Sequence, residues 1–292
     1  MAAPAEPAQR RASSLELRLL SAAVLIPIAA LAAWLGDWAW NGLVVIFGTE
    51  MILEWCRIVA HRRVGQEVAP FPSTRASVET VVTPVLVAGG LILFARYPQI
   101  GSGIAWSYLA ICAVAAAIVA VPRYGKRALW FSLGPIYVAV PCAAIMMLRD
   151  EAHGLQQILW IVALVIAADT GAYAAGRTIG GPKLAPRISP NKTWAGLGGA
   201  VVSAALVGAV TGALLGPTGI WPLTAVSASL AVVEQAGDLA KSALKRHFGV
   251  KDAGNIIPGH GGAIDRVDGL IAVAVAVAGI NHWIGMSVLT WL

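Results

Sequence analysis

The chain has 292 residues, of which 58% are hydrophobic and only 12% are charged, and its formal net charge is +6. Soluble domains contain about 25% charged residues, so this composition excludes an ordinary soluble protein and predicts a polytopic membrane protein. The three cysteines all lie in apolar segments without a CxxC pattern, which supports neither a disulfide framework nor a zinc site.

The N-terminal residues 1–15 are rich in Ala and Pro, and we predict a disordered cytoplasmic tail. Residues 16–292 are predicted to form a single all-α membrane domain, with N-terminal spans in about 16–121 and catalytic spans and loops in about 128–292. The first apolar run has the basic flank of a secretory signal, but many spans follow it, so we interpret it as retained. About nine runs are long enough to cross a bilayer: about 19–35, 38–59, 78–95, 103–121, 128–148, 155–175, 194–215, 219–240 and 268–290.

Basic residues are distributed unequally between the two sides that nine spans define. With the N-terminus in the cytoplasm, 19 of the 21 Lys and Arg residues are cytoplasmic, and only Arg96 and Arg149 face the other side. Cytoplasmic segments carry an excess of Lys and Arg, so the count predicts a cytoplasmic N-terminus and a C-terminus outside. This distribution also accounts for the basic net charge, and nucleic acid is therefore not expected as a partner.

Two carboxylates lie near the cytoplasmic end of the second predicted span. Glu50 and Glu54 are four residues apart and share one helix face. Ionisable groups in a bilayer are costly and are candidates for function. An interfacial pair near Arg57 is an equally supported interpretation of these two residues.

Three further carboxylates lie in the later spans. Asp169 is surrounded by small residues, which allow close helix packing beside a hydrated cavity. Glu234 and Asp238 share a face near the cytoplasmic end of the eighth span. A buried Asp238 needs a partner, which either Lys241 or a metal ion can supply.

The stretch from Ser242 to Asp268 is polar, although it lies between two apolar segments. The glycines of Pro258–Gly262 let backbone N–H groups approach an anion closely. Asp265 and Asp268 share a face if a helix begins there. Three cations can neutralise phosphate oxygens: Lys245, Arg246 and Lys251. Cations for phosphates and carboxylates for a divalent metal are the groups that nucleotidyl transfer requires.

This stretch resembles the signature of the phosphatidate cytidylyltransferases, or CDP-diacylglycerol synthases. Its residues follow the order Ser242-x2-Lys245-Arg246-x4-Lys251-Asp252, then Pro258-x-His260-Gly261-Gly262-x2-Asp265-Arg266-x-Asp268. Residues 169–173 and 189–193 resemble the same family, whereas Ala195 stands where its members usually have Glu.

The resemblance implies a membrane nucleotidyltransferase of phospholipid biosynthesis, with CTP and phosphatidate as substrates and CDP-diacylglycerol and diphosphate as products. It also implies membrane lipids as surroundings, a homodimer, and a bacterial inner membrane with the active site facing the cytoplasm. In the expected reaction, a phosphatidate oxygen attacks the α-phosphorus of CTP and diphosphate leaves in line.

We predict a role for each polar residue of the site. Lys245 and Arg246 offset phosphate charge, and Asp265 and Asp268 are catalytic carboxylates. The metal ligands are expected to bind Mg²⁺, with Mn²⁺ as a substitute, and are Asp238, Asp265 and Asp268. Two carboxylates are expected to line the cavity or orient these ligands: Asp169 and Glu234. The predicted substrate-binding residues are Lys192, Ser242, Lys251, Asp252, His260, Gly261, Gly262 and Arg266.

Two other functions fit parts of the sequence. A CDP-alcohol phosphatidyltransferase, another CTP-linked lipid enzyme, needs an Arg where Val273 stands and further aspartates after it, so the sequence disfavours that class. A membrane transporter could use the carboxylates Asp169, Glu234 and Asp238 as an ion site. Against a transporter, the charges gather at one membrane face and no inverted repeat is visible.

Overall fold

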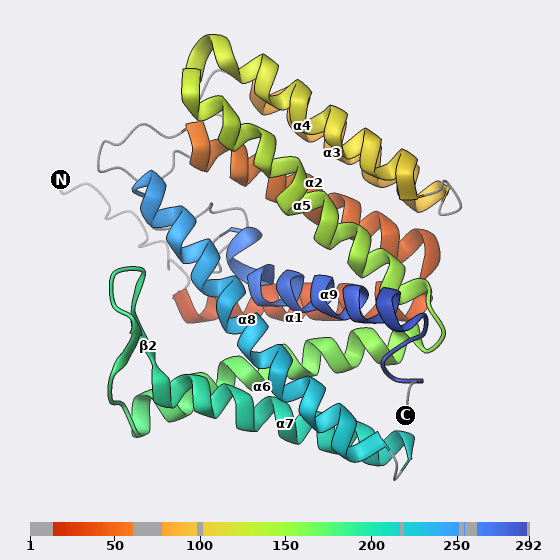
Figure 1. Ribbon diagram of the computed structural model, residues 1–292, viewed down its shortest axis with the longest axis vertical. Coiled ribbons are helices and arrows are strands. Elements are labelled where there is room, and N and C mark those ends of the chain that lie inside the picture. The colour runs from red at the N-terminus through yellow and green to blue at the C-terminus, as the bar shows by residue number, and fades with distance from the viewer. Residues whose placement is uncertain are drawn as a thin grey trace, which may run out of the picture.

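The computed structural model describes residues 14–60, 78–97, 102–216, 219–250, 254 and 262–290. These residues form long helices that run back and forth through one bundle (Figure 1). The helices are α1 (Ser14–Leu35), α2 (Asp37–Ala60), α3 (Val78–Arg96), α4 (Ser102–Tyr124), α5 (Ala128–Asp150), α6 (Gly154–Thr178), α7 (Trp194–Leu215), α8 (Ile220–Phe248) and α9 (Ile264–Ile284). A short 3-10 turn, η1 (Gly125–Arg127), joins α4 to α5.

The bundle has two groups of helices with α9 between them. Helices α2, α3, α4 and α5 pack on one another in the first group, and α6, α7 and α8 form the second. Helix α9 contacts α5 on one side and α6 and α8 on the other (Figure 1). The last helix of the chain therefore joins the two groups.

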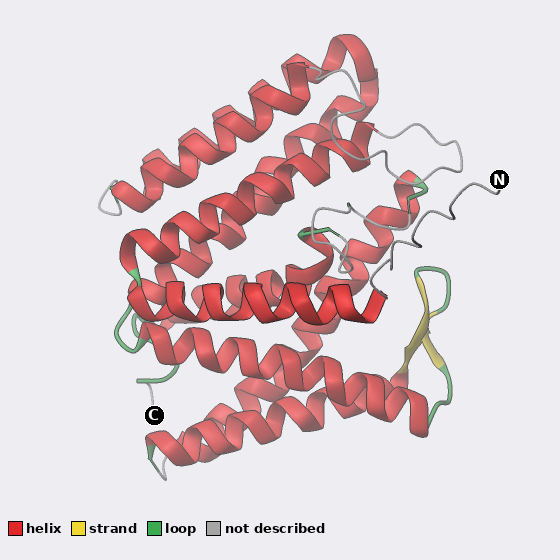
Figure 2. Cartoon of the chain, turned by 180° about the vertical axis from the view of Figure 1, so that it is seen from behind, coloured by secondary structure: helices red, strands yellow, loops and turns green. Residues whose placement is uncertain are grey.

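A small antiparallel β-hairpin separates α6 from α7. Strand β1 (Lys183–Ala185) pairs with β2 (Ser189–Thr193), and the hairpin projects from the end of the bundle at which α6 stops (Figure 2). The turn before it uses Gly180 and Gly181 at φ +69° and +90°, a conformation that favours glycine. The expectation of helices alone overlooked this hairpin.

The prediction of an all-α membrane protein is confirmed, and each predicted span falls on one helix. Within the described ranges, four helical stretches are long and apolar enough to cross a membrane: Ile104–Asp150, Gly154–Thr178, Trp194–Leu215 and Ile264–Ile284. Two shorter apolar helical stretches are Ala23–Leu35 and Thr80–Arg96. Large apolar side chains such as Ile46, Ile118 and Leu214 are more than 60% exposed, as expected for surfaces that face lipid tails.

Two predicted boundaries are wrong, and both errors concern the site. The ninth span was placed at 268–290, but α9 begins at Ile264 and ends at Ile284, where Gly285 takes φ +79°. The eighth span was ended at 240, but α8 continues to Phe248. The charged residues after 240 lower the hydropathy without interrupting the helix, because Lys, Arg, Leu and Ala are all good helix formers.

Small residues let α7 pack closely against its neighbours. Its buried positions recur every fourth residue along one face: Gly196, Ala200, Ala204, Gly208 and Gly212. On an adjacent face, a Cβ at Gly199 would overlap the carbonyl oxygen of Gly171 in α6 and lie 2.5 Å from the Cβ of Ala175. Close backbone approach of this kind replaces the hydrophobic effect as a source of helix association in a bilayer.

Replacing Gly199 with Ala should therefore lower stability by about 1–3 kcal/mol, because the added methyl group overpacks the α6–α7 contact. Gly198 is the matched control, since a Cβ there meets nothing within 4 Å. Gly198→Ala should leave the thermal unfolding midpoint in detergent unchanged or raise it, through higher helix propensity. Equal midpoints for the two variants would contradict the packing argument.

Candidate active site

The ammonium group of Lys241 lies among three carboxylates near the end of the bundle at which α8 stops and α9 starts. Its Nζ is 3.0 Å from Asp238 Oδ1 and 3.8 Å from Asp265 Oδ1, and it also forms an ion pair with Asp268 Oδ2. The Lys241 side chain is only 8% exposed. The predicted convergence of the three aspartates is therefore present, and a lysine occupies the place between them.

Two further lysines extend this arrangement at its ends. Lys192 Nζ lies 2.5 Å from Asp238 Oδ2, and Lys245 Nζ lies 2.6 Å from Asp265 Oδ1. Positive and negative groups thus alternate through one continuous network. We call these six residues the lysine–aspartate array: Lys192, Asp238, Lys241, Lys245, Asp265 and Asp268.

Helical spacing explains how α8 and α9 build the array. Asp238, Lys241 and Lys245 occur at intervals of three and four residues, so they lie on one face of α8. Asp265 and Asp268 are three residues apart in the first turns of α9, as the sequence predicted for a helix beginning there. A carboxylate in the first turn of a helix is also favoured by the positive end of the helix dipole.

Close packing of the two helices keeps the array compact. A Cβ at Gly237 in α8 would lie 2.6 Å from the Cβ of Ala272 in α9. A Cβ at Gly269 would lie 2.9 Å from the side chain of Glu234. Both contacts require glycine, and together they bring the lysines of α8 within reach of the aspartates of α9.

The β-hairpin delivers Lys192 to the array. Lys192 is in β2, and the next residue, Thr193, caps α7 by accepting a hydrogen bond from the backbone N–H of Gly196 at 3.0 Å. The backbone N–H of Trp194 donates to the carbonyl oxygen of Pro182 at 3.1 Å, which closes the hairpin on itself. The Ser-Pro-Asn-Lys-Thr segment therefore caps the start of α7 and also places the Lys192 ammonium group in the array.

Glu54 of α2 holds the start of α9. Its Oε1 accepts the backbone N–H of Ala263 at 2.7 Å, and its Oε2 accepts that of Ile264 at 2.8 Å. The Glu54 side chain is fully buried, and Gly254 and Gly262 pack against it so closely that a Cβ on either would lie within 2.7 Å of Oε1. A carboxylate that caps two backbone groups at a helix N-terminus fixes the direction of that helix.

Only one of the two glutamates in α2 fits the interfacial interpretation. Glu50 forms an ion pair with Arg57 at 3.4 Å, whereas Glu54 turns inward to cap α9. The sequence gives both residues the same spacing and the same apolar surroundings. Their different roles depend on contacts with a segment more than 200 residues away, which local spacing does not reveal.

A cavity of 150 Å³ lies beside the array, between α6, α7 and α8. Its polar lining comes from α6, β2 and α8: Asp169, Tyr173, Asn191, Lys192, Gln235 and Asp238. Gln235 connects the groups, because its Oε1 accepts from Lys192 at 2.7 Å and its Nε2 donates to Glu234 Oε2 at 2.7 Å. Asp169 and Glu234 thus border the array, and Gln235 is a residue that the sequence analysis missed.

The other predicted residues lie apart from the array or outside the described residues. Arg246 is exposed, and its Nε donates to the carbonyl oxygen of Ile188 in the hairpin at 3.4 Å. Ser242 is half-buried on α8, Arg266 is exposed on α9, and Gly262 is buried against Glu54. Four predicted residues lie outside the described residues: Lys251, Asp252, His260 and Gly261.

The chemistry of the donors suits a divalent cation, but the described residues contain no preformed metal site. Asp238, Asp265 and Asp268 offer hard carboxylate oxygens around a single cationic position, as Mg²⁺ requires. Within the described ranges, no three Asp, Glu, His or Cys side chains are arranged to hold a metal ion. Lys241 takes that position in this structure.

The amino-acid sequence is similar to known proteins along most of its length. The model of the cytidylyltransferase family matches residues 16–283. Proteins named phosphatidate cytidylyltransferase are similar to this chain: that of Brucella suis biovar 1 is 35% identical over 263 residues, which cover 90% of this chain and 91% of the relative. The Haemophilus influenzae protein is 36% identical over 175 residues, covering 53% and 61%. The Bacillus subtilis protein is 38% identical over 146 residues, covering 49% and 54%.

The family match extends from within the first turn of α1 to within the last turn of α9, and it includes the lysine–aspartate array. The predicted resemblance and the prediction of an enzyme are both confirmed by these comparisons. The chain belongs to the cytidylyltransferase family.

Proposed function

We propose that this protein is a membrane phosphatidate cytidylyltransferase, which converts CTP and phosphatidate to CDP-diacylglycerol and diphosphate. Similarity to a relative of that name over 90% of the chain supports the proposal. The observation that carries it is the lysine–aspartate array, since its ammonium and carboxylate groups are those a phosphate-transferring site needs. A transporter is not favoured, because the array lies at one end of the bundle.

The charge balance of the array supports a requirement for an additional cation. Three lysines face three aspartates, so the array is neutral before any substrate binds. A triphosphate and a lipid phosphate together bring several negative charges, which a neutral site does not compensate. We therefore propose that Mg²⁺, with Mn²⁺ as a substitute, binds together with the nucleotide.

The residues that would hold this ion are Asp238, Asp265 and Asp268. For these carboxylates to bind the ion, Lys241 would have to exchange them for phosphate oxygens as its partners. A bound Mg²⁺ supplies charge neutralisation and orientation of the phosphate chain. Lys241 and Lys245 then become free to donate to phosphate oxygens as point charges. One exchange of partners thus converts a neutral array into a site for a polyanion.

In the proposed reaction, an oxygen of the phosphatidate monoester forms a bond to the α-phosphorus of CTP. The bond between the α-phosphorus and the bridging oxygen to the β-phosphorus breaks, and diphosphate leaves in line with the electron pair of that bond. The phosphatidate oxygen is ionised at neutral pH, so no strong general base is required. The lysines stabilise charge that accumulates on the leaving diphosphate.

We place the lipid phosphate near the cavity that α6, α7 and α8 surround. Tyr173 lines this cavity and is 66% exposed, and Trp194 at the start of α7 is 59% exposed. Exposed aromatic side chains suit the interface between water and lipid tails. Lys192 lines the same cavity and belongs to the array, so it can meet a phosphate that enters from the bilayer.

The proposal includes about nine spans, a cytoplasmic N-terminus, a C-terminus outside, and a location in a bacterial inner membrane with the active site facing the cytoplasm. It also includes the homodimer that the resemblance implies, which the mass of the detergent-solubilised particle checks. The arrangement of the helices supports this topology (Figure 1). The array lies where α8 ends and α9 begins, and the opposite end of the bundle is the one where α2 begins and α5 ends.

A reporter enzyme fused after Leu292 should be located outside the cytoplasm. A reporter inserted within 61–77 should be located in the cytoplasm. The charge asymmetry of the chain is the reason for this expectation. Paired reporters that are active on opposite sides of the membrane give the measurement. A cytoplasmic signal from the C-terminal fusion would contradict an odd number of spans.

The activity is tested by the incorporation of radiolabelled CTP into chloroform-extractable lipid by purified protein in detergent, with phosphatidate and Mg²⁺. Lys245→Ala should lower kcat/KM by about 10²-fold, and Asp265→Asn by about 10³-fold, because each removes a group of the charge network. Lys183→Ala changes an exposed residue of β1, so it is the matched lysine control and should retain activity. No labelled lipid from the parent protein would reject the proposed function.

The same assay with Mg²⁺ titrated tests the metal. In Asp268→Asn, any remaining activity should need about tenfold more Mg²⁺, since one of three ligands is lost. An Mg²⁺ curve identical to that of the parent protein in Asp238→Asn and Asp268→Asn would contradict the metal assignment while leaving the activity itself unaffected.

Glu54→Gln should weaken the cap of α9 and thereby misplace Asp265 and Asp268. The amide keeps one acceptor but presents an NH₂ group to the second backbone N–H, so stability should fall by about 1–3 kcal/mol and kcat should fall more than KM rises. Thermal unfolding and steady-state kinetics give the two measurements. Glu50→Gln, which loses only the ion pair to Arg57, is the control and should leave kcat unchanged.

A further inference from the structure

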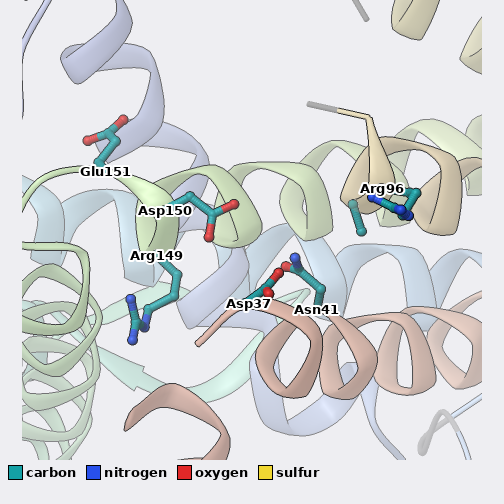
Figure 3. Close-up of a pocket in the computed structure, with 7 residues that line it drawn as sticks. Asp37, Asn41, Arg96, Arg149, Asp150 and Glu151 are labelled. Atoms are coloured by element: carbon teal, nitrogen blue, oxygen red, sulfur yellow. The ribbon is translucent and has the colours of Figure 1, made fainter. Parts of the chain in front are cut away.

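A second charged pocket lies at the opposite end of the bundle from the lysine–aspartate array. Its volume is 620 Å³, and it is formed where α2 begins and where α3 and α5 end. Figure 3 shows its charged side chains, with Asp37, Asn41 and Asp150 grouped near the middle and the two arginines on either side. The charged and amide residues that line it are Asp37, Asn41, Arg96, Arg149, Asp150 and Glu151.

Asn41 is the strongest sign that this pocket binds a ligand. The residue is only 6% exposed, it lines the pocket, and its Oδ1 has no hydrogen-bond partner among the described residues. A buried amide oxygen without a donor is costly, and such groups in folded proteins normally find one. The described residues supply no donor for this oxygen, and a ligand in the pocket can supply one.

Two charged side chains of the pocket already form hydrogen bonds within the protein. Arg149 donates from Nε to the carbonyl oxygen of Ala33 at 2.6 Å and from a terminal nitrogen to that of Trp34 at 3.2 Å, so it caps the end of α1. Glu151 accepts hydrogen bonds from Gln157 at 3.0 Å and Asn281 at 2.6 Å. These contacts leave other groups of the pocket to meet a ligand.

The remaining groups have opposite charges and are separated across the pocket. Asp37 and Asp150 lie near Asn41, whereas Arg96 lies on the far side of Asn41 (Figure 3). Among the described residues, none of these three charged side chains forms an ion pair. A ligand that satisfies them must carry a positive donor at one end and a negative group at the other.

Aromatic side chains place the pocket at the depth of lipid headgroups. Trp34, Trp38 and Tyr97 are 68%, 78% and 45% exposed, and they lie at the end of α1, the start of α2 and the end of α3. Trp and Tyr concentrate at the boundary between lipid tails and water. The pocket therefore opens beside the headgroups of one leaflet.

We propose that this pocket binds the headgroup of a zwitterionic phospholipid that carries a primary ammonium group. The ammonium donates to Asn41 Oδ1 and to the carboxylates of Asp37 and Asp150, and the phosphodiester pairs with Arg96. An anionic lipid fits less well, because three carboxylates outnumber two arginines in the lining. A bare metal ion also fits less well, since the described residues contain no preformed group of metal ligands.

This proposal is independent of the catalytic activity, and lipid binding tests it directly. The purified, delipidated protein in detergent is titrated with phosphatidylethanolamine, phosphatidylcholine and phosphatidylglycerol, and binding is followed by native mass spectrometry. Phosphatidylethanolamine should bind about tenfold more tightly than phosphatidylcholine, whose quaternary ammonium has no N–H to donate. Phosphatidylglycerol tests whether charge alone accounts for binding, and glycerophosphoethanolamine tests whether the headgroup binds without its tails.

Asn41→Leu distinguishes a binding role from a structural one. Removing the unpaired amide should leave the unfolding midpoint of the lipid-free protein unchanged or raise it, while the rise in midpoint that phosphatidylethanolamine produces should disappear. Asp150→Asn should weaken binding of phosphatidylethanolamine about tenfold, whereas Lys126→Gln, at the opposite end of the bundle, should not. Equal binding of the three lipids by the parent protein, or an unchanged lipid preference in both Asn41→Leu and Asp150→Asn, would overturn the proposal.

Discussion

The ion pairs between Lys241 and three aspartates are the interaction on which the site depends. Asp238, Asp265 and Asp268 come from two helices, and the ammonium group of Lys241 between them offsets the mutual repulsion of their charges. The glycine contacts between these helices allow the approach, but they do not offset that repulsion. Charge compensation and close packing thus act together at the contact between α8 and α9.

The hydrophobic pattern of the sequence was sufficient to locate the helices, because runs of about 20 apolar residues leave few alternatives in a bilayer. This pattern did not predict the extent of a helix where the helix carries charged residues. Residues 241–248 are too polar for a span, yet they continue α8 and carry two lysines of the array. The hairpin was missed for a related reason: its three-residue and five-residue strands contain no alternating apolar pattern.

The candidate site could be predicted in its components but not in its connections. Motif spacing identified five of the six residues of the array, and it noted Lys241 only as one of two candidate partners for Asp238. Gln235 and Glu54 carry no motif, so their roles follow only from the three-dimensional contacts. Local periodicity does not reveal long-range hydrogen bonds: Glu50 pairs with Arg57 in its own helix, whereas the chemically identical Glu54 binds a segment more than 200 residues away.

The cap that Glu54 provides also has a consequence for how the protein is made. Glu54 and Ala263 are 209 residues apart in the chain, so α2 leaves the ribosome long before the backbone groups that it will bind. Until α9 arrives, a carboxylate inside the bundle has no donors and the lysines of α8 lack two of their aspartates. In the order of synthesis, α9 is the last of these helices to arrive, and it supplies both the backbone donors for Glu54 and two aspartates of the array. The array is therefore complete only after α9, which carries Asp265 and Asp268, has been made.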